Sequence, residues 1–91
     1  MLYLVSYDVV DDGQRRRIQN CLKDYGRRVQ YSVYECELSE DEVPELWGKL
    51  AREVDATQDS VRRYRLCGGC EREVTILGKG DRYSEPGFVV I

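Results

Sequence analysis

Histidine is absent from this 91-residue chain, and proline occurs only twice. Without histidine, neither a Ser-His-Asp triad nor a Cys-His pair can form, which excludes the usual serine and cysteine protease chemistry. The sequence also lacks a run of about 20 apolar residues, the length needed to cross a bilayer. Its first residues show no basic region and no cleavage site of a signal peptide. We therefore expect a cytoplasmic protein that makes no membrane contact.

Cysteine is scarce as well, with four residues in the chain. Four are too few for a disulfide-stapled small protein, and a reducing compartment keeps thiols reduced. Cys67 and Cys70 have the C-x₂-C spacing of half a zinc site, but no histidine can complete it. Because Cys21 and Cys36 are expected in a helix and a strand, we favour reduced thiols without metal. A metal site shared by two subunits remains open.

The charges are nearly balanced, with 17 acidic and 14 basic residues and a net charge of −3. This balance does not indicate a surface that binds phosphate everywhere. Basic residues gather within residues 15–28, whereas acidic residues gather within residues 35–45. The pattern predicts a basic side and an acidic side.

The chain has room for one domain, and its short length makes a homodimer a natural way to enlarge a small core. Residues 2–9 are apolar and β-branched, which predicts a buried strand. Asp11 or Asp12 can then cap a helix that Gly26 ends. Residues 27–38 predict one long strand or two short ones.

A capping box of Ser39 and Glu42 opens a second predicted helix, whose apolar stripe runs from Val43 to Val54. Strands are predicted at residues 60–66 and 74–77, with a loop at residues 67–70 between them. The apolar end Phe88–Ile91 predicts a strand added to a sheet of this chain or of a partner. The order of elements indicates an α+β sandwich, with helices on one face of a mostly antiparallel sheet.

Asp8 stands where the first strand ends, and such edges often gather ligands near a helix start. Magnesium prefers oxygen ligands and is often held by one or two carboxylates. On pattern alone, however, a solvated strand end is the simpler interpretation of Asp8, and a helix cap is the simpler one of Asp11 and Asp12.

Five arginines could bind phosphate or could form a solvated surface, and the pattern leaves both open: Arg15, Arg16, Arg17, Arg27 and Arg28. Trp47 lies in the second helix's stripe and is expected in the core. For Tyr7, Tyr31 and Tyr34, strand alternation does not decide between core packing and stacking on bases.

Three segments together resemble the CRISPR-associated protein two family: residues 7–17, residues 26–36 and residues 60–67. The resemblance extends over about residues 1–78. It implies a ferredoxin-like β-α-β-β-α-β sandwich with an extra C-terminal strand, in a homodimer. Residues 1–78 would form the domain, and residues 79–91 a tail whose last strand pairs with the partner subunit. Tyr34 stands where most members carry Phe.

The resemblance also implies a Mg²⁺-dependent endonuclease of antiviral CRISPR adaptation, acting on single-stranded RNA or double-stranded DNA. Asp8 of each subunit would bind the metal and serve in catalysis, and the five arginines would bind the nucleic acid. The family also works with a CRISPR integrase subunit. An alternative is therefore a non-catalytic dimer that bridges integrase subunits and positions DNA. An RNA-binding or small-molecule sensor on the same fold is a third possibility.

Overall fold

The computed structural model describes residues 1–73 and 75–78. The elements follow one another as β1 (Leu2–Asp8), α1 (Asp12–Lys23), β2 (Gly26–Gln30), β3 (Val33–Glu37), α2 (Glu42–Ala51), β4 (Ser60–Leu66) and α3 (Gly68–Arg72). This succession confirms the predicted α+β class. The predicted terminal strand Phe88–Ile91, like the whole predicted tail 79–91, lies outside the described residues.

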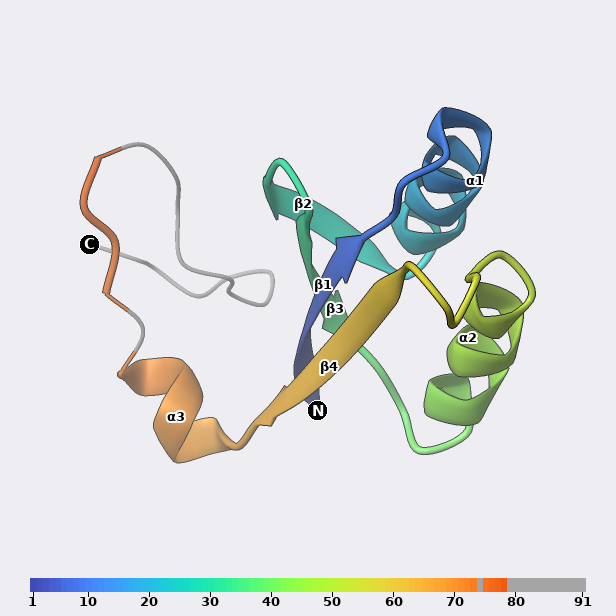
Figure 1. The fold of residues 1–91 in the computed structure, drawn as a ribbon. Coiled ribbons are helices and arrows are strands. Elements are labelled where there is room, and N and C mark those ends of the chain that lie inside the picture. The colour runs from blue at the N-terminus through green and yellow to red at the C-terminus, as the bar shows by residue number, and fades with distance from the viewer. Residues whose placement is uncertain (74, 79–91) are drawn as a thin grey trace.

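The four strands form one antiparallel sheet in the order β2-β3-β1-β4. Since β3 lies between β1 and β2, the β1-α1-β2 unit is split, as in the ferredoxin-like arrangement. Helices α1 and α2 lie on the same side of the sheet (Figure 1). One face of the sheet is therefore covered by these helices, and the other, which we call the open face, is not.

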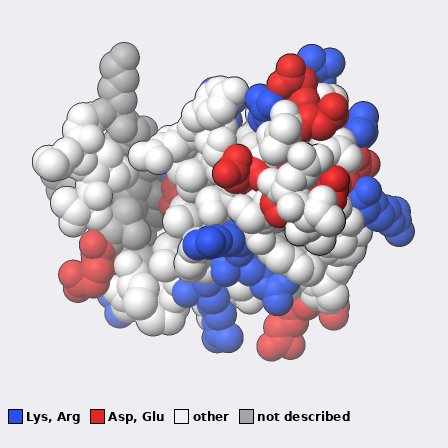
Figure 2. Space-filling view, viewed as in Figure 1, with Lys and Arg blue, Asp and Glu red and all other residues white. Residues whose placement is uncertain are grey.

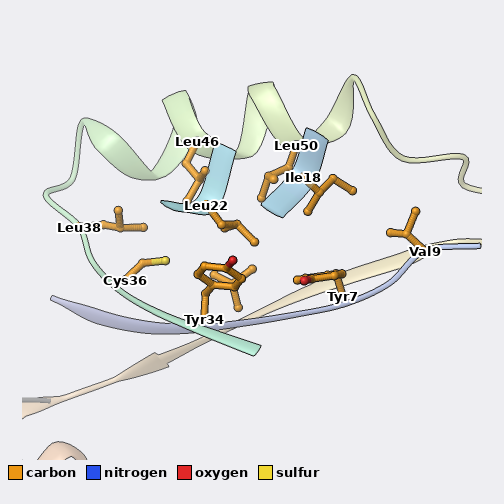
Figure 3. Close-up of a cluster of buried hydrophobic side chains, with 10 residues drawn as sticks. Tyr7, Val9, Ile18, Leu22, Tyr34, Cys36, Leu38, Leu46 and Leu50 are labelled. Carbon is orange, nitrogen blue, oxygen red and sulfur yellow. The ribbon is translucent and has the colours of Figure 1, made fainter. Parts of the chain in front are cut away.

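The hydrophobic core fills the layer between the sheet and the two helices (Figure 3). On β1 and just after it, Val5, Tyr7 and Val9 are buried in this core and alternate with residues of the open face. Figure 3 shows Tyr7 and Val9 on the side of the sheet that the helices cover. The helices and β3 supply further buried side chains, which are Ile18, Leu22, Tyr34, Cys36, Leu46 and Leu50. Trp47 is half-buried against this core, as predicted.

Both long helices begin with the caps that the sequence predicts. The carboxylate of Asp11 accepts a hydrogen bond from the N–H of Gln14 at 2.8 Å. Ser39 and Glu42 exchange two bonds: the Ser39 N–H donates to Glu42 Oε1 at 2.9 Å, and the Glu42 N–H donates to Ser39 Oγ at 3.3 Å. These side chains satisfy N–H groups that a helix start leaves without partners.

The prediction that Gly26 ends α1 is wrong. The helix ends at Lys23, and Gly26 is the first residue of β2. A Cβ atom at this position would lie 2.1 Å from the carbonyl oxygen of Glu35 and 2.7 Å from Cys36 Sγ. Glycine is thus required by the close approach of β3. The segment predicted as one long strand or two short ones, residues 27–38, proves to hold two strands. The chain turns between β2 and β3 at residues 31–32.

Two further differences lie beyond β4. Residues 75–77 form no strand, so the strand predicted at residues 74–77 is not seen there. Residues 68–72 form the short helix α3 within and after the predicted loop. The Cys70 N–H donates to Cys67 Sγ at 3.4 Å, a bond typical of a side chain at a helix start. Within the part of the chain that the structure describes, no helix is both long and apolar enough to span a membrane.

Candidate nucleic-acid and metal site

Asp8 is the last residue of β1, and it lies opposite Ser60 of β4. Its neighbours Tyr7 and Val9 are buried toward the helices, so strand alternation directs Asp8 to the open face. Asp8 is exposed. Among residues 1–73 and 75–78 its carboxylate has neither a hydrogen bond nor an ion pair, which leaves both oxygens available to a ligand.

The loop after Asp8 is held by two other aspartates. Asp11 caps α1, and Asp59 Oδ1 accepts the N–H of Val10 at 2.9 Å. The second oxygen of Asp59 accepts the N–H of Asp55 at 3.0 Å. Asp11 and Asp59 therefore fix the backbone around Asp8. The sequence offered Asp11 or Asp12 as the cap, and the structure shows that it is Asp11. The sequence gave no signal for Asp59, whose partner Val10 is distant along the chain.

Arg15 is bound within the protein rather than directed to solvent. Its Nε donates to the carbonyl oxygen of Val9 and its Nη2 to that of Val10, both at 3.3 Å, and the guanidinium also pairs with Asp12. A hydrogen bond with Tyr31 raises the pKa of Arg15 above its ordinary value. Arg15 thus joins the loop after β1 to the turn between β2 and β3.

The other two arginines of α1 differ from each other. Arg17 Nε lies 2.6 Å from Glu53 Oε2, and this bond raises the pKa of Arg17. Arg16 is exposed and has no ion pair within the described ranges 1–73 and 75–78. Two residues before the buried Ile18, it lies on the side of α1 that faces away from the sheet. Of the predicted cluster Arg15 to Arg17, only Arg16 presents a cation that is not already paired there.

The turn between β2 and β3 brings an aromatic ring beside the end of β1. The hydroxyl of Tyr7 donates to the carbonyl oxygen of Tyr31 at 3.3 Å, and the N–H of Tyr7 donates to that of Ser32 at 3.1 Å. Tyr31 is 67% exposed, and the guanidinium carbon of Arg28 lies 5.8 Å from the centre of its ring. An exposed ring next to an arginine can stack on a base while the cation binds phosphate.

The three tyrosines that the sequence left undecided are thus distinguished. Tyr7 and Tyr34 are 4% and 1% exposed and belong to the core, with ring centres 6.4 Å apart. Only Tyr31 is open to a ligand. Its signal in the sequence was weak, because strand alternation does not extend through the turn in which it lies.

The predicted division into a basic and an acidic side does not hold throughout. Arg27 lies 3.7 Å from the buried Glu35, which belongs to the acidic segment. Lys49 lies 3.4 Å from Glu45. Figure 2 likewise shows basic and acidic side chains mixed over the end of the molecule that carries α1 and α2. Of the five arginines predicted to bind nucleic acid, Arg16 and Arg28 are the two without an ion pair in the described part of the chain.

Asp8 fits a hard cation in chemical type, but one chain supplies a single carboxylate. No group of three or more His, Cys, Asp or Glu side chains that could hold a metal is found in the described residues. Magnesium can be held by one or two carboxylates when water and phosphate oxygens fill the other positions. Within the described residues, Asp8 therefore belongs to no ready-made metal cluster.

Comparison with known proteins identifies the family. The sequence profile of the family described as "CRISPR associated protein Cas2" matches residues 1–74. The chain belongs to the Cas2 family. It is 39% identical over 90 residues to "CRISPR-associated endoribonuclease Cas2 3" of Synechocystis sp., an alignment that covers 99% of this chain and 98% of the relative.

Solved structures of Cas2 proteins share the fold. Cas2 of Streptococcus pyogenes superposes with a TM-score of 0.77 at 35% identity, covering 86% of this chain and 100% of that one. A chain of a structure described as a partial Cas6-RT-Cas1–Cas2 complex gives a TM-score of 0.73 at 26% identity, covering 84% of this chain and 89% of that one. These likenesses confirm the ferredoxin-like fold that the sequence resemblance implied.

Proposed function

We propose that this Cas2-family chain acts in CRISPR adaptation as a homodimeric, Mg²⁺-dependent endonuclease that cleaves phosphodiester bonds in single-stranded RNA or double-stranded DNA. The observation that carries the proposal is the exposed carboxylate of Asp8 at the end of β1, which has no partner among residues 1–73 and 75–78. The Synechocystis relative is named an endoribonuclease, which supports hydrolysis of this bond.

The chemistry follows from what the chain possesses and lacks. A bound Mg²⁺ ion would polarise the phosphate and supply an activated water. Asp8 would hold the ion. The metal would be needed to activate the water, because the chain has no histidine to act as a general base at neutral pH. Arg28 would bind the backbone phosphate and Tyr31 would stack on a neighbouring base. Arg16 would add a phosphate contact further along the strand.

The open face of the sheet supports the homodimer. Leu4 of β1 lies opposite Tyr64 of β4 on this face, and Tyr64 is 46% exposed. Asp8 lies on the same face, four residues further along β1, opposite Ser60. When two open faces pack about a two-fold axis, apolar side chains become buried and the two Asp8 carboxylates can approach the axis. Each chain then supplies one carboxylate to a shared ion.

The decisive experiment compares cleavage of labelled single-stranded RNA and double-stranded DNA in Mg²⁺ by wild type and Asp8→Asn. We expect the substitution to lower the cleavage rate by at least about a hundredfold, because it removes the charge of a metal ligand. Asp41→Asn is the matched control, since Asp41 is exposed and its side chain makes no cap bond at α2. Equal cleavage by wild type and Asp8→Asn would refute the proposal.

Wild type and Asp8→Asn also distinguish this nuclease from a second candidate function. A non-catalytic dimer that bridges integrase subunits and positions DNA is favoured by the likeness to a chain of a complex described as containing Cas1 and Cas2. In that case neither protein cleaves, and Asp8→Asn captures DNA with the integrase subunit as well as wild type does. Loss of capture in Asp8→Asn would contradict this second function.

A further inference from the structure

Cys67 and Cys70 form a close sulfur pair outside the proposed metal site. Their Sγ atoms are 3.3 Å apart and hydrogen-bonded to each other. Both side chains are exposed, at the point where β4 ends and α3 begins. Figure 1 shows this point at the opposite end of β4 from α1 and α2. Soluble reagents can therefore reach both sulfur atoms without opening the core.

The geometry is close to that of a disulfide. An S–S bond is about 2.0 Å long, so the two Sγ atoms, now 3.3 Å apart, must approach by a little over about 1 Å to form one. Small rotations of the two side chains are enough to close the gap between the sulfur atoms. Neither sulfur is enclosed by packing that would resist this movement.

The two thiols are also chemically unequal. The N–H of Cys70 donates to Cys67 Sγ at 3.4 Å and, with the Cys70 side chain, lowers the pKa of Cys67. The hydrogen bond with Cys67 raises the pKa of Cys70. Since the thiolate is the attacking form, Cys67 is the better nucleophile near neutral pH, and Cys70 is placed to attack second.

We propose that Cys67 and Cys70 are a thiol–disulfide exchange site, which small disulfides oxidise reversibly to an intrachain disulfide. With oxidised glutathione, the Cys67 thiolate attacks one sulfur, the S–S bond breaks, and one glutathione leaves as a thiolate that takes a proton from water. Cys70 then loses its proton to water and attacks Cys67 Sγ, which releases the second glutathione. Two protein thiols are oxidised while one glutathione disulfide is reduced to two thiols.

The other two cysteines provide internal controls in the full-length chain. Cys36 is fully buried, and burial raises its pKa to about 11. Cys21 is half-buried on α1, and desolvation raises its pKa as well. Neither should react with glutathione disulfide while the protein remains folded.

The test incubates the folded wild type in glutathione buffers of stepped potential, alkylates the free thiols and counts them on each cysteine by mass spectrometry. We expect Cys67 and Cys70 to be protected together and to be released by reductant, while Cys21 and Cys36 keep thiols that alkylate after unfolding. Cys70→Ser should accumulate the mixed disulfide on Cys67. It should form that adduct about tenfold faster than Cys67→Ser forms one on Cys70.

Two results would overturn the proposal. One is a wild-type protein that accumulates mixed glutathione disulfides without closing the intrachain bond. The other is protection of both thiols by Zn²⁺, with one ion per two chains and no disulfide in any buffer, which would assign a metal site shared between subunits instead.

Discussion

Tyr34 carries a hydroxyl group inside the core. Its side chain is 1% exposed, and the hydroxyl finds no hydrogen-bond partner in residues 1–73 and 75–78. Burial raises the pKa of this phenol, since the charged form would be poorly solvated there. A buried hydroxyl without a partner costs about 1–3 kcal/mol relative to water. The position needs an aromatic ring and gains nothing from the oxygen.

Tyr34→Phe should therefore leave the free energy of unfolding unchanged or raise it by up to about 1 kcal/mol, as measured by urea denaturation. Tyr7→Phe is the matched control, because the two rings are neighbours in the core. The hydroxyl of Tyr7 does donate a bond, to the carbonyl oxygen of Tyr31, so its loss should cost about 0.5–1.5 kcal/mol. A larger loss for Tyr34→Phe than for Tyr7→Phe would contradict this account of the core.

Among the secondary-structure elements, β2 and α2 show that glycine can have opposite roles. In β2, Gly26 lets the backbone of β3 approach, and a Cβ atom would lie 2.1 Å from the Glu35 carbonyl oxygen. In α2, Gly48 is exposed and a Cβ atom there would meet nothing within 4 Å. The first glycine is imposed by packing, whereas the second only lowers the helix propensity.

We predict that Gly26→Ala lowers the free energy of unfolding by at least about 2 kcal/mol, since the strands must separate to admit the methyl group. Gly48→Ala should raise it by about 0.5–1 kcal/mol. Thermal or urea unfolding of both variants tests the contrast. A Gly26→Ala protein as stable as wild type would show that β2 and β3 do not approach so closely.

The elements also show why some parts of the fold were predictable and others were not. The caps at Asp11 and Ser39 were predicted correctly because each depends on partners three residues away. The role of Gly26 was missed because it depends on β3, which follows only after a turn. Helix α3 was missed because it is short and is preceded by a cysteine, Cys67, a residue that gives no usual cap signal.

At the scale of the whole molecule, the candidate site was only partly predictable. Asp8 could be placed at the end of β1 from the local sequence. The sequence could not show which arginines form ion pairs within the protein. The partners of Arg17 and Arg27 are Glu53 and Glu35, which only the folded chain brings near. Tyr31 became a candidate ligand-binding residue in the same way. The folded chain places Arg28 over its ring and the Tyr7 hydroxyl against its carbonyl oxygen.

A metal ion shared by two Asp8 carboxylates is tested most directly by titrating Mn²⁺, as a spectroscopic substitute for Mg²⁺, and counting bound ions per chain by electron paramagnetic resonance. One tightly bound ion per two chains is expected in wild type and in the control Asp41→Asn, and none in Asp8→Asn. A stoichiometry of one ion per chain, or tight binding that survives Asp8→Asn, would contradict a metal site completed by the second subunit.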